Sequence, residues 1–161
     1  NLNCSFCPGT TRRPETMTLE RFSSVIDKVK ESAKTVYFHI MGEPLTHPLI
    51  GEFLDICDAA GLKVTITTNG TFLGEKGPLL LNKPALKQLN ISIHSFEPGD
   101  TLFTEGMGNL VLPGGKIILS GILQEQLSGI VLRLEKERFE VIDKAEQEDW
   151  VGLIAAKGTS D

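Results

Sequence analysis

The order of apolar and polar positions along the first sixty residues predicts helix, strand and helix. Helical spacing of apolar residues after Thr18 predicts a first helix with Thr18 as its N-cap. A β-branched and aromatic run at residues 35–41 predicts a strand, which stops at Gly42-Glu43-Pro44. His47-Pro48 is expected to open a second helix, and Gly61 to end it. The apolar stripes of the two helices are Leu19, Phe22, Val25, Ile26 and Val29, and Ile50, Phe53, Leu54 and Cys57.

The next stretch continues the alternation of strands and helices. Residues 63–68 predict a strand that ends at Asn69-Gly70, residues 78–88 a helix, and residues 89–94 a third strand. Such alternation indicates right-handed β-α-β units and a parallel sheet. Because function collects where parallel strands end, the polar residues after each strand become the candidate site.

The C-terminal third has a different order of elements. The turn Pro113-Gly114-Gly115 leads into a predicted strand at 116–120, and Gly121 is expected to begin a helix. Residues 139–145 and 150–156 predict an antiparallel hairpin around the turn 146–149. The apolar stripe of the helix is Leu123, Leu127, Ile130, Val131 and Leu134.

Composition narrows the class of protein. The chain has 161 residues, 40% of them hydrophobic and 23% charged, which is typical of one globular domain. No apolar run approaches the length of a membrane span, and no signal peptide is recognisable. A net charge of −5 argues against nonspecific nucleic-acid binding. Three cysteines, an odd number, do not form a disulfide framework, so we expect a reducing, cytoplasmic setting.

Charge and chemistry are distributed unevenly. All three cysteines and all three histidines precede residue 97. Basic and acidic residues balance at ten each up to Glu97, whereas six basic and eleven acidic residues follow from Pro98 onward. This shift marks a candidate boundary after residue 97. We expect a segment 1–97, a junction 98–108 and a segment 109–161, which together could form one composite domain.

Cys4 and Cys7 form a Cys-x-x-Cys pair that allows four interpretations. A thioredoxin-type pair normally opens a helix directly, but Pro8-Gly9 follows here. A zinc half-site would need a second close pair of ligands, which the sequence lacks. The pair could also be a chance arrangement on the surface, or the thiolates could bind an iron–sulfur cluster.

The residues around this pair favour the cluster. The stretch Asn1-Leu2-Asn3-Cys4-Ser5-Phe6-Cys7 resembles the radical S-adenosylmethionine (SAM) enzymes, whose loop reads Cys-x-x-x-Cys-x-aromatic-Cys. On this resemblance the first cysteine of the family falls just before Asn1. Three further stretches match the family's strand-end motifs: Met41-Gly42-Glu43-Pro44-Leu45, Thr65-Ile66-Thr67-Thr68-Asn69-Gly70 and Ser92-Ile93-His94. The resemblance covers residues 1 to about 97.

The resemblance implies a fold, two cofactors and a partner. It implies strands of a partial (β/α) barrel that form a mostly parallel sheet with helices on both faces. It implies a 4Fe–4S cluster held by Cys4 and Cys7, and SAM cleaved reductively to a 5′-deoxyadenosyl radical. A small electron donor such as flavodoxin or ferredoxin would supply the electron. The implied SAM contacts are Phe6 near the adenine, Glu43 at the amino group with Gly42 and Pro44 beside it, and Thr68, Asn69, Ser92 and His94 toward the ribose and carboxylate.

Each of these residues also has a purely structural interpretation. Glu43 could be a solvated acid in a turn, and Thr68 and Asn69 are ordinary turn formers. His39 and His94 could be satisfied strand histidines. Cys57 lies on an apolar helix stripe and is expected in the core, and Met41 is expected to pack.

The C-terminal segment resembles another family. Leu112-Pro113-Gly114-Gly115-Lys116, the strand ending in Ser120-Gly121-Ile122-Leu123 and the later Asp149-Trp150-Val151 resemble the end of Rossmann-type methyltransferases that act on a ribosomal protein. The similarity covers about residues 109–157 and implies a closing strand, helix and hairpin. The glycine-rich SAM loop of that family is absent. The whole chain therefore reads as a chimera or a misassembled fragment of two families.

Three functions remain open. The first is a radical SAM iron–sulfur protein that is incomplete and inactive as this chain stands. The second is a fragment of a SAM-dependent protein methyltransferase, and the third is a scaffold without catalysis. The sequence does not indicate a substrate.

Overall fold

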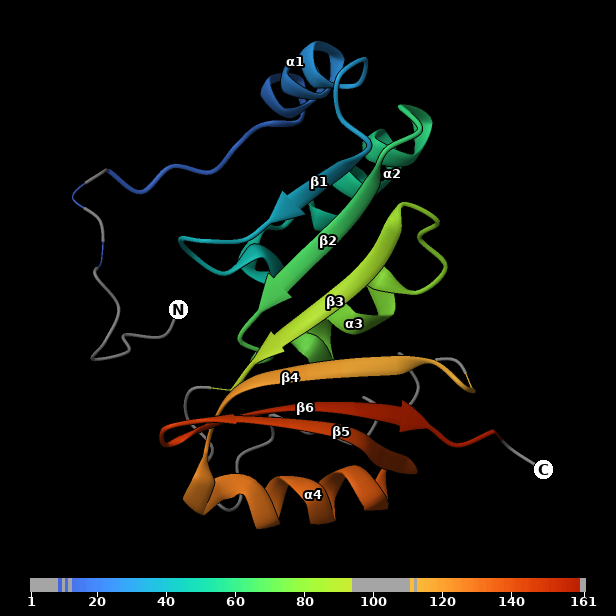
Figure 1. Ribbon diagram of the computed structural model, residues 1–161. Coiled ribbons are helices and arrows are strands. Elements are labelled where there is room, and N and C mark those ends of the chain that lie inside the picture. Colours follow the sequence, from blue (N-terminus) through green and yellow to red (C-terminus); the bar gives the residue numbers. More distant parts are fainter. Residues whose placement is uncertain (1–8, 10, 12, 94–110, 112, 160–161) are drawn as a thin grey trace. The chain divides into compact units, whose positions relative to one another are not determined.

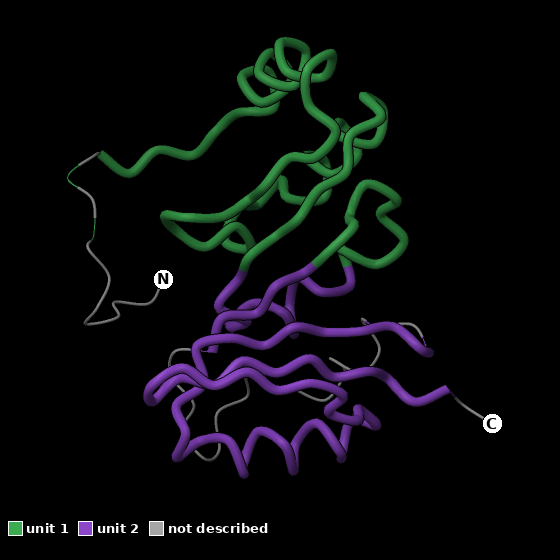
Figure 2. Tube along the Cα trace, in the orientation of Figure 1, with its two compact units in different colours: residues 1–67, 79–88 green, residues 68–78, 89–161 purple. Residues whose placement is uncertain are grey.

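The computed structural model describes residues 9, 11, 13–93, 111 and 113–159, in two compact units. Unit 1 comprises residues 1–67 and 79–88, and unit 2 comprises residues 68–78 and 89–161 (Figure 2). The helices are α1 (Leu19–Val29), α2 (Ile50–Ala59), α3 (Leu73–Leu80) and α4 (Leu127–Lys136), with 3-10 turns η1 (Pro44–Thr46) and η4 (Gln124–Gln126). The strands are β1 (Thr35–Phe38), β2 (Lys63–Thr68), β3 (Leu86–Ser92), β4 (Lys116–Leu123), β5 (Phe139–Gln147) and β6 (Trp150–Lys157) (Figure 1).

Helix α1 begins where its cap was predicted. The Thr18 hydroxyl accepts a hydrogen bond from the backbone N–H of Arg21 at 3.3 Å. The pKa of Glu20 lies below its usual value, because its carboxylate accepts hydrogen bonds from its own backbone N–H and from Thr18. Phe22 and Ile26 are buried as expected, but Val25 is 43% exposed, so the buried stripe is narrower than predicted.

The core of unit 1 lies between its helices and two parallel strands. β1 pairs with β2 in a register that sets Val36 opposite Val64 and Phe38 opposite Ile66. Phe22 of α1 stacks on Phe53 of α2 with ring centroids 4.0 Å apart. The buried apolar set is Phe22, Ile26, Leu45, Ile50, Phe53, Leu54, Cys57, Leu62, Val64, Ile66, Leu80 and Ala85, which includes all four core residues predicted for the second helix. Gly61, at φ +70, follows the α2 C-cap as predicted.

Strand β1 ends earlier than the sequence predicts. It stops at Phe38 rather than Met41, because Ile40 has the left-handed φ of +83, which leaves the extended geometry of a strand. Ile40 is 81% exposed, and Met41 is also exposed. The expectation that Met41 packs in the interior is therefore wrong. Helix α2 likewise begins at Ile50, after a turn that contains Pro48, and not at the proline itself.

The helix predicted at residues 78–88 is wrong. Helix α3 begins at Leu73 and ends at Leu80, with Pro78 tolerated inside it. The chain then turns through Asn82 at φ +58, and Pro84 lacks the N–H that a continuing helix would need. Strand β3 consequently starts at Leu86, three residues before the predicted start at Leu89. Just before β3 begins, the Ala85 carbonyl accepts a hydrogen bond from the Val64 N–H of β2 at 2.7 Å.

Unit 2 contains the remainder of β3 and a sheet closed by a hairpin. In unit 1 the hydrogen-bonded strands follow the order β1-β2-β3, and in unit 2 the order β3-β4-β6-β5. The boundary between the units falls within β3, after Gln88. β3 and β4 are parallel, whereas β6 is antiparallel to both β4 and β5. Helix α4 packs on β5 and buries Ile130 and Leu134 (Figure 1). The predicted hairpin is confirmed, with a tighter loop at Glu148-Asp149.

Gly121 is a bulge in a strand and does not begin a helix. β4 continues to Leu123, and its register with β6 shifts between Leu119 and Ile122. Gly121 sits in that shift at φ +75, a conformation that glycine adopts without a steric cost. The helix begins only at Leu127, after η4, where the Leu123 N–H donates to Gln126 Oε1 at 3.0 Å.

These elements confirm the predicted α/β class with a mostly parallel sheet and a strand–helix–hairpin ending. Helices on both faces, and the boundaries at residues 97 and 109, stay predictions. In the part of the chain that the structure describes, no helix has the length and apolar character of a membrane span.

Candidate cofactor-binding site

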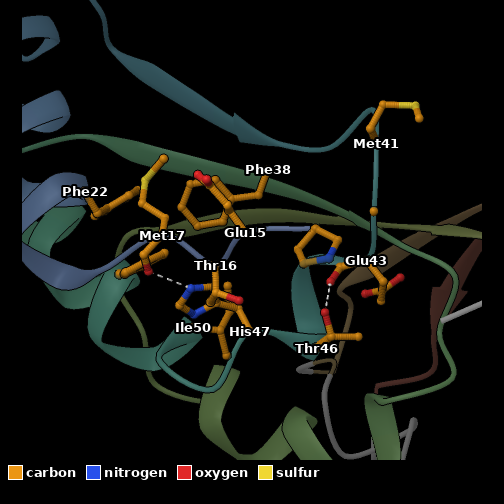
Figure 3. A pocket seen from close by; sticks show the side chains of 13 residues that line it. Glu15, Thr16, Met17, Phe22, Phe38, Met41, Glu43, Thr46, His47 and Ile50 are labelled. Atoms are coloured by element: carbon orange, nitrogen blue, oxygen red, sulfur yellow. Dashed lines mark hydrogen bonds between the residues drawn. The ribbon is translucent and has the colours of Figure 1, made fainter. Parts of the chain in front are cut away.

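A cavity of about 450 Å³ opens in unit 1 beside the Gly42-Glu43-Pro44 motif (Figure 3). One wall is the strap, defined here as residues 15–17 before α1. The opposite wall is the turn of residues 41–47 between β1 and α2. Phe22, Phe38, Ile50 and Phe53 complete the lining from the two helices and β1. The cavity thus lies at the carboxyl end of β1, where a parallel sheet usually holds its ligand.

The turn is built around Glu43. Its side chain is 8% exposed, and Oε1 accepts the backbone N–H of Leu45 at 3.0 Å, which caps η1. Its backbone carbonyl accepts the Thr46 hydroxyl at 2.6 Å (Figure 3). Pro44 occupies the first turn of η1, where a missing N–H costs nothing. Glu43 is therefore a buried acid with a structural role, and the alternative interpretation as a solvated turn acid is wrong.

His47 joins the two walls of the cavity. Its Nε2 lies 3.0 Å from the carbonyl oxygen of Met17 in the strap, thirty residues earlier in the chain (Figure 3). Its Nδ1 lies 3.1 Å from the Leu49 N–H, which donates to it. The ring also packs on Phe53 at a centroid distance of 4.4 Å.

Aromatic rings form the apolar floor. His47 packs on Phe53, Phe53 stacks on Phe22 at 4.0 Å, and Phe22 meets Phe38 edge-on at 5.8 Å. This continuous column fixes the side chains beneath the cavity, because stacked rings have few alternative rotamers in a packed core.

The charged residues in the lining of the cavity are acidic. Glu15 and Glu43 belong to it, and no described lining residue is lysine or arginine. Glu15 is exposed and approaches Arg21 at 3.7 Å, an ion pair that solvent screens strongly. The buried Glu43 is therefore the charge that a ligand in this cavity would meet.

The second predicted motif comprises the end of β2 and the turn after it, and its last three residues, Thr68-Asn69-Gly70, belong to unit 2. The buried Thr68 hydroxyl accepts the Gly70 N–H at 3.1 Å. The Asn69 side-chain oxygen accepts both the N–H and the hydroxyl of Thr71, at 3.0 and 2.7 Å. Both residues thus act as turn formers, which was the structural interpretation of this motif. Ser92 is the last residue of β3, opposite Ser120 of β4.

The other predicted site residues, Cys4, Phe6, Cys7 and His94, lie outside the described residues. Cys57 is buried as expected, and burial raises the pKa of its thiol to about 11, so it is an inert core residue. Elsewhere in the described ranges, no three His, Cys, Asp or Glu side chains are arranged to hold a metal ion.

The sequence interpretation missed the strap and His47 as parts of the site. His47 was assigned only to the start of a helix, and residues 15–17 were given no role. The available signal was the position of His47 three residues after Pro44, at a strand end where polar residues collect. No signal in the sequence paired His47 with Met17, because that contact is made by a backbone carbonyl.

Comparison with known proteins supports the radical SAM resemblance of the sequence. The family model of the radical SAM superfamily matches residues 1–108, more than half of the chain. The chain therefore belongs to the radical SAM superfamily. The AdoMet-dependent heme synthase of Methanosarcina barkeri is 34% identical over 96 residues, which are 58% of this chain and 28% of that protein.

The C-terminal part matches another family. The model of ribosomal protein L11 methyltransferase matches residues 101–158, overlapping the first match by eight residues, 101–108. The enzyme of that name from Bacillus licheniformis is 38% identical over 55 residues, 34% of this chain and 18% of its own. A solved ribosomal protein L11 methylase of Lactobacillus delbrueckii subsp. bulgaricus aligns with 86% of this chain and 78% of its own, at 18% identity and a TM-score of 0.38.

The chain thus matches the model of one family over residues 1–108 and that of another over residues 101–158, as the change of resemblance predicted. The chain spans less than a third of either curated relative, 28% of one and 18% of the other.

Proposed function

We propose that this chain is the N-terminal part of a radical SAM iron–sulfur protein joined to a methyltransferase-like end. In this proposal Cys4 and Cys7 ligate a 4Fe–4S cluster and the unit 1 cavity receives the amino-acid end of SAM. The bound cluster would supply the electron that cleaves the sulfonium to methionine and a 5′-deoxyadenosyl radical. A small flavodoxin- or ferredoxin-like donor would reduce it.

The observation that carries the proposal is the buried Glu43 of the Gly-Glu-Pro motif in the wall of a cavity. The facing wall is the strap, which follows Cys7 in the sequence after seven residues. The family resemblance assigns the Gly42-Glu43-Pro44 turn to the amino group of SAM and the cysteines before the strap to the cluster.

The lining suits a cationic, partly apolar ligand. SAM carries an ammonium and a sulfonium, and the buried Glu43 carboxyl group can accept a charge-assisted hydrogen bond from the ammonium. Gly42 has φ +91, and a Cβ there would meet no atom within 4 Å, so its backbone is open to a ligand. A volume of about 450 Å³ is within the usual range for small-molecule sites.

The remaining contacts follow from the family resemblance. Phe6 is assigned to the adenine, and Thr68, Asn69, Ser92 and His94 to the ribose and carboxylate. The hydrogen bonds of Thr68 with Gly70 and of Asn69 with Thr71 lie within one turn, which would hold the turn's shape for these contacts. Pro44 would keep the Glu43 turn rigid through its fixed φ.

Anaerobic reconstitution with iron and sulfide tests the proposal. The wild-type chain, Cys4→Ala, Cys7→Ala and Cys57→Ala would be compared by iron content and by visible absorbance. Because the resemblance places a third thiolate just before Asn1, a variant with one cysteine added there completes the comparison. We expect a cluster band that both loop substitutions abolish, that Cys57→Ala leaves unchanged, and that the added cysteine strengthens.

Other outcomes would favour other functions. Saturable SAM binding without any cluster would support a methyltransferase fragment, which the match over residues 101–158 makes the second candidate. Neither cluster nor SAM binding, in a chain that unfolds cooperatively, would support a scaffold. A cluster that survives both loop substitutions would refute the assignment of Cys4 and Cys7.

A further inference from the structure

We propose that His47 is a positioning residue that sets the separation of the two walls of the unit 1 cavity. The inference rests on the proposed function, because it concerns SAM binding in that cavity. It does not make His47 a group that touches the reacting atoms. The reasons lie in its two hydrogen bonds and in the elements that those bonds join.

The ring is held in one tautomer by its partners. The Leu49 N–H can only donate, so Nδ1 must be the acceptor and carry no hydrogen. The Met17 carbonyl can only accept, so Nε2 must carry the hydrogen. Both bonds, at 3.1 and 3.0 Å, therefore exist together only in the neutral imidazole with the hydrogen on Nε2.

These bonds connect the strap, the turn of residues 41–47 and the start of α2. His47 follows η1 directly, and its N–H bonds to the Pro44 carbonyl at 3.1 Å, so it moves with the turn that Glu43 caps. The Leu49 bond holds the ring at the start of α2, and the contact with Phe53 leaves it little rotational freedom. The Nε2 bond then fixes the strap relative to that rigid assembly.

The strap has little else in the described residues to hold it in place. Residues 15–17 belong to no helix or strand, and each is exposed. Glu15 contacts Arg21 at 3.7 Å, in an ion pair that solvent screens. Loss of the His47 bond would therefore let one cavity wall move, while the core of unit 1 stays packed.

A matched pair of substitutions isolates that bond. His47→Asn can still place an acceptor near the Leu49 N–H but is too short to reach Met17. His47→Gln is long enough to donate an amide N–H to the Met17 carbonyl. We expect His47→Asn to weaken SAM binding by roughly tenfold and His47→Gln to stay within about threefold of wild type, as expected for one hydrogen bond.

Three measurements on the reconstituted chain decide the question. Equilibrium dialysis gives the Kd of SAM, and thermal unfolding shows whether each variant keeps its fold. Nitrogen-15 NMR of the imidazole reports the tautomer in the wild-type chain without any turnover, and the Nε2–H form is expected. His47→Ala is a third variant, and the Asn and Gln pair decides if it fails to fold.

The outcomes separate this inference from the proposed function. Wild-type chain that binds neither cluster nor SAM overturns both. Wild-type binding with equal Kd values in His47→Asn and His47→Gln overturns the positioning role alone. An imidazole with its hydrogen on Nδ1 also overturns it, because the bond to Met17 could not then form. A Kd that follows Tm across all variants would mean that His47 acts only through stability, and refutes the inference as well.

Discussion

Glu43 offers a test that separates its structural role from its proposed ligand role. Replacement by alanine removes the acceptor for the N–H of Leu45, and Leu45 is fully buried. Loss of an N-cap acceptor costs about 0.5–2 kcal/mol, and a buried unsatisfied donor about 1–3 kcal/mol. We therefore expect Glu43→Ala to lower the free energy of unfolding by about 2 kcal/mol. In a chain of this size that corresponds to a Tm lower by roughly 4–8 °C.

Glu43→Gln is the matched control, because its amide oxygen can still accept the Leu45 N–H while the negative charge is gone. We expect its unfolding free energy to remain within about 0.5 kcal/mol of wild type. SAM binding should nevertheless weaken by about 10- to 150-fold, since a hydrogen bond to a charged group contributes about 1.5–3 kcal/mol.

Urea unfolding and equilibrium dialysis on the same reconstituted samples provide the two numbers. If Glu43→Gln binds SAM as tightly as wild type, the carboxylate does not meet the ammonium, and Glu43 is only the cap of η1. If Glu43→Ala unfolds like wild type, the cap energy derived from the 3.0 Å bond is wrong.

Three further predictions concern the fold. Thr18→Ala should reduce the unfolding free energy by about 1 kcal/mol through loss of the α1 cap, and Thr18→Ser should restore most of it in urea titrations. Burial raises the pKa of the Cys57 thiol from an ordinary 9.0 to about 11. The free energy of unfolding should therefore be unaffected by this thiol below pH 9 and fall by on the order of 2–3 kcal/mol as the pH rises to 11, because only the unfolded thiol ionises there. Cys57→Ala should flatten that part of the pH profile. Gly121→Ala should cost about 1–2 kcal/mol at its φ of +75, whereas Gly152→Ala, where a Cβ would meet the Leu119 carbonyl at an ordinary 3.7 Å, should cost less.

Each of these has a result that contradicts it. Equal stability of the Thr18 alanine and serine variants would show that the 3.3 Å bond contributes nothing. An unchanged alkaline profile in Cys57→Ala would assign the loss of stability to other groups. Equal costs at Gly121 and Gly152 would mean that the bulge tolerates a side chain, and that its left-handed backbone is not required.

Local patterns predicted most elements, and failed where two signals competed. The Thr18 cap, the stop at Gly61 and the hairpin were all visible in the sequence, because each is set by residues that lie close together along the chain. The helix at 78–88 was misplaced because apolar spacing continues past Pro84, where the backbone cannot. Gly121 was misread because a glycine that begins a helix and one that forms a bulge look alike without the partner strand.

For the site, the sequence alone determined the chemistry and the structure decided the geometry. Cys4 and Cys7, Glu43 in its Gly-Glu-Pro turn and the change of family near residue 100 are properties of residue type and order, which the sequence contains. The burial of Glu43, the turns that engage Thr68 and Asn69, and the bond from His47 to the Met17 carbonyl are not. They depend on which backbone groups the fold brings within hydrogen-bond distance of a side chain. Every residue except proline carries the same backbone groups, so only the folded chain can distinguish them.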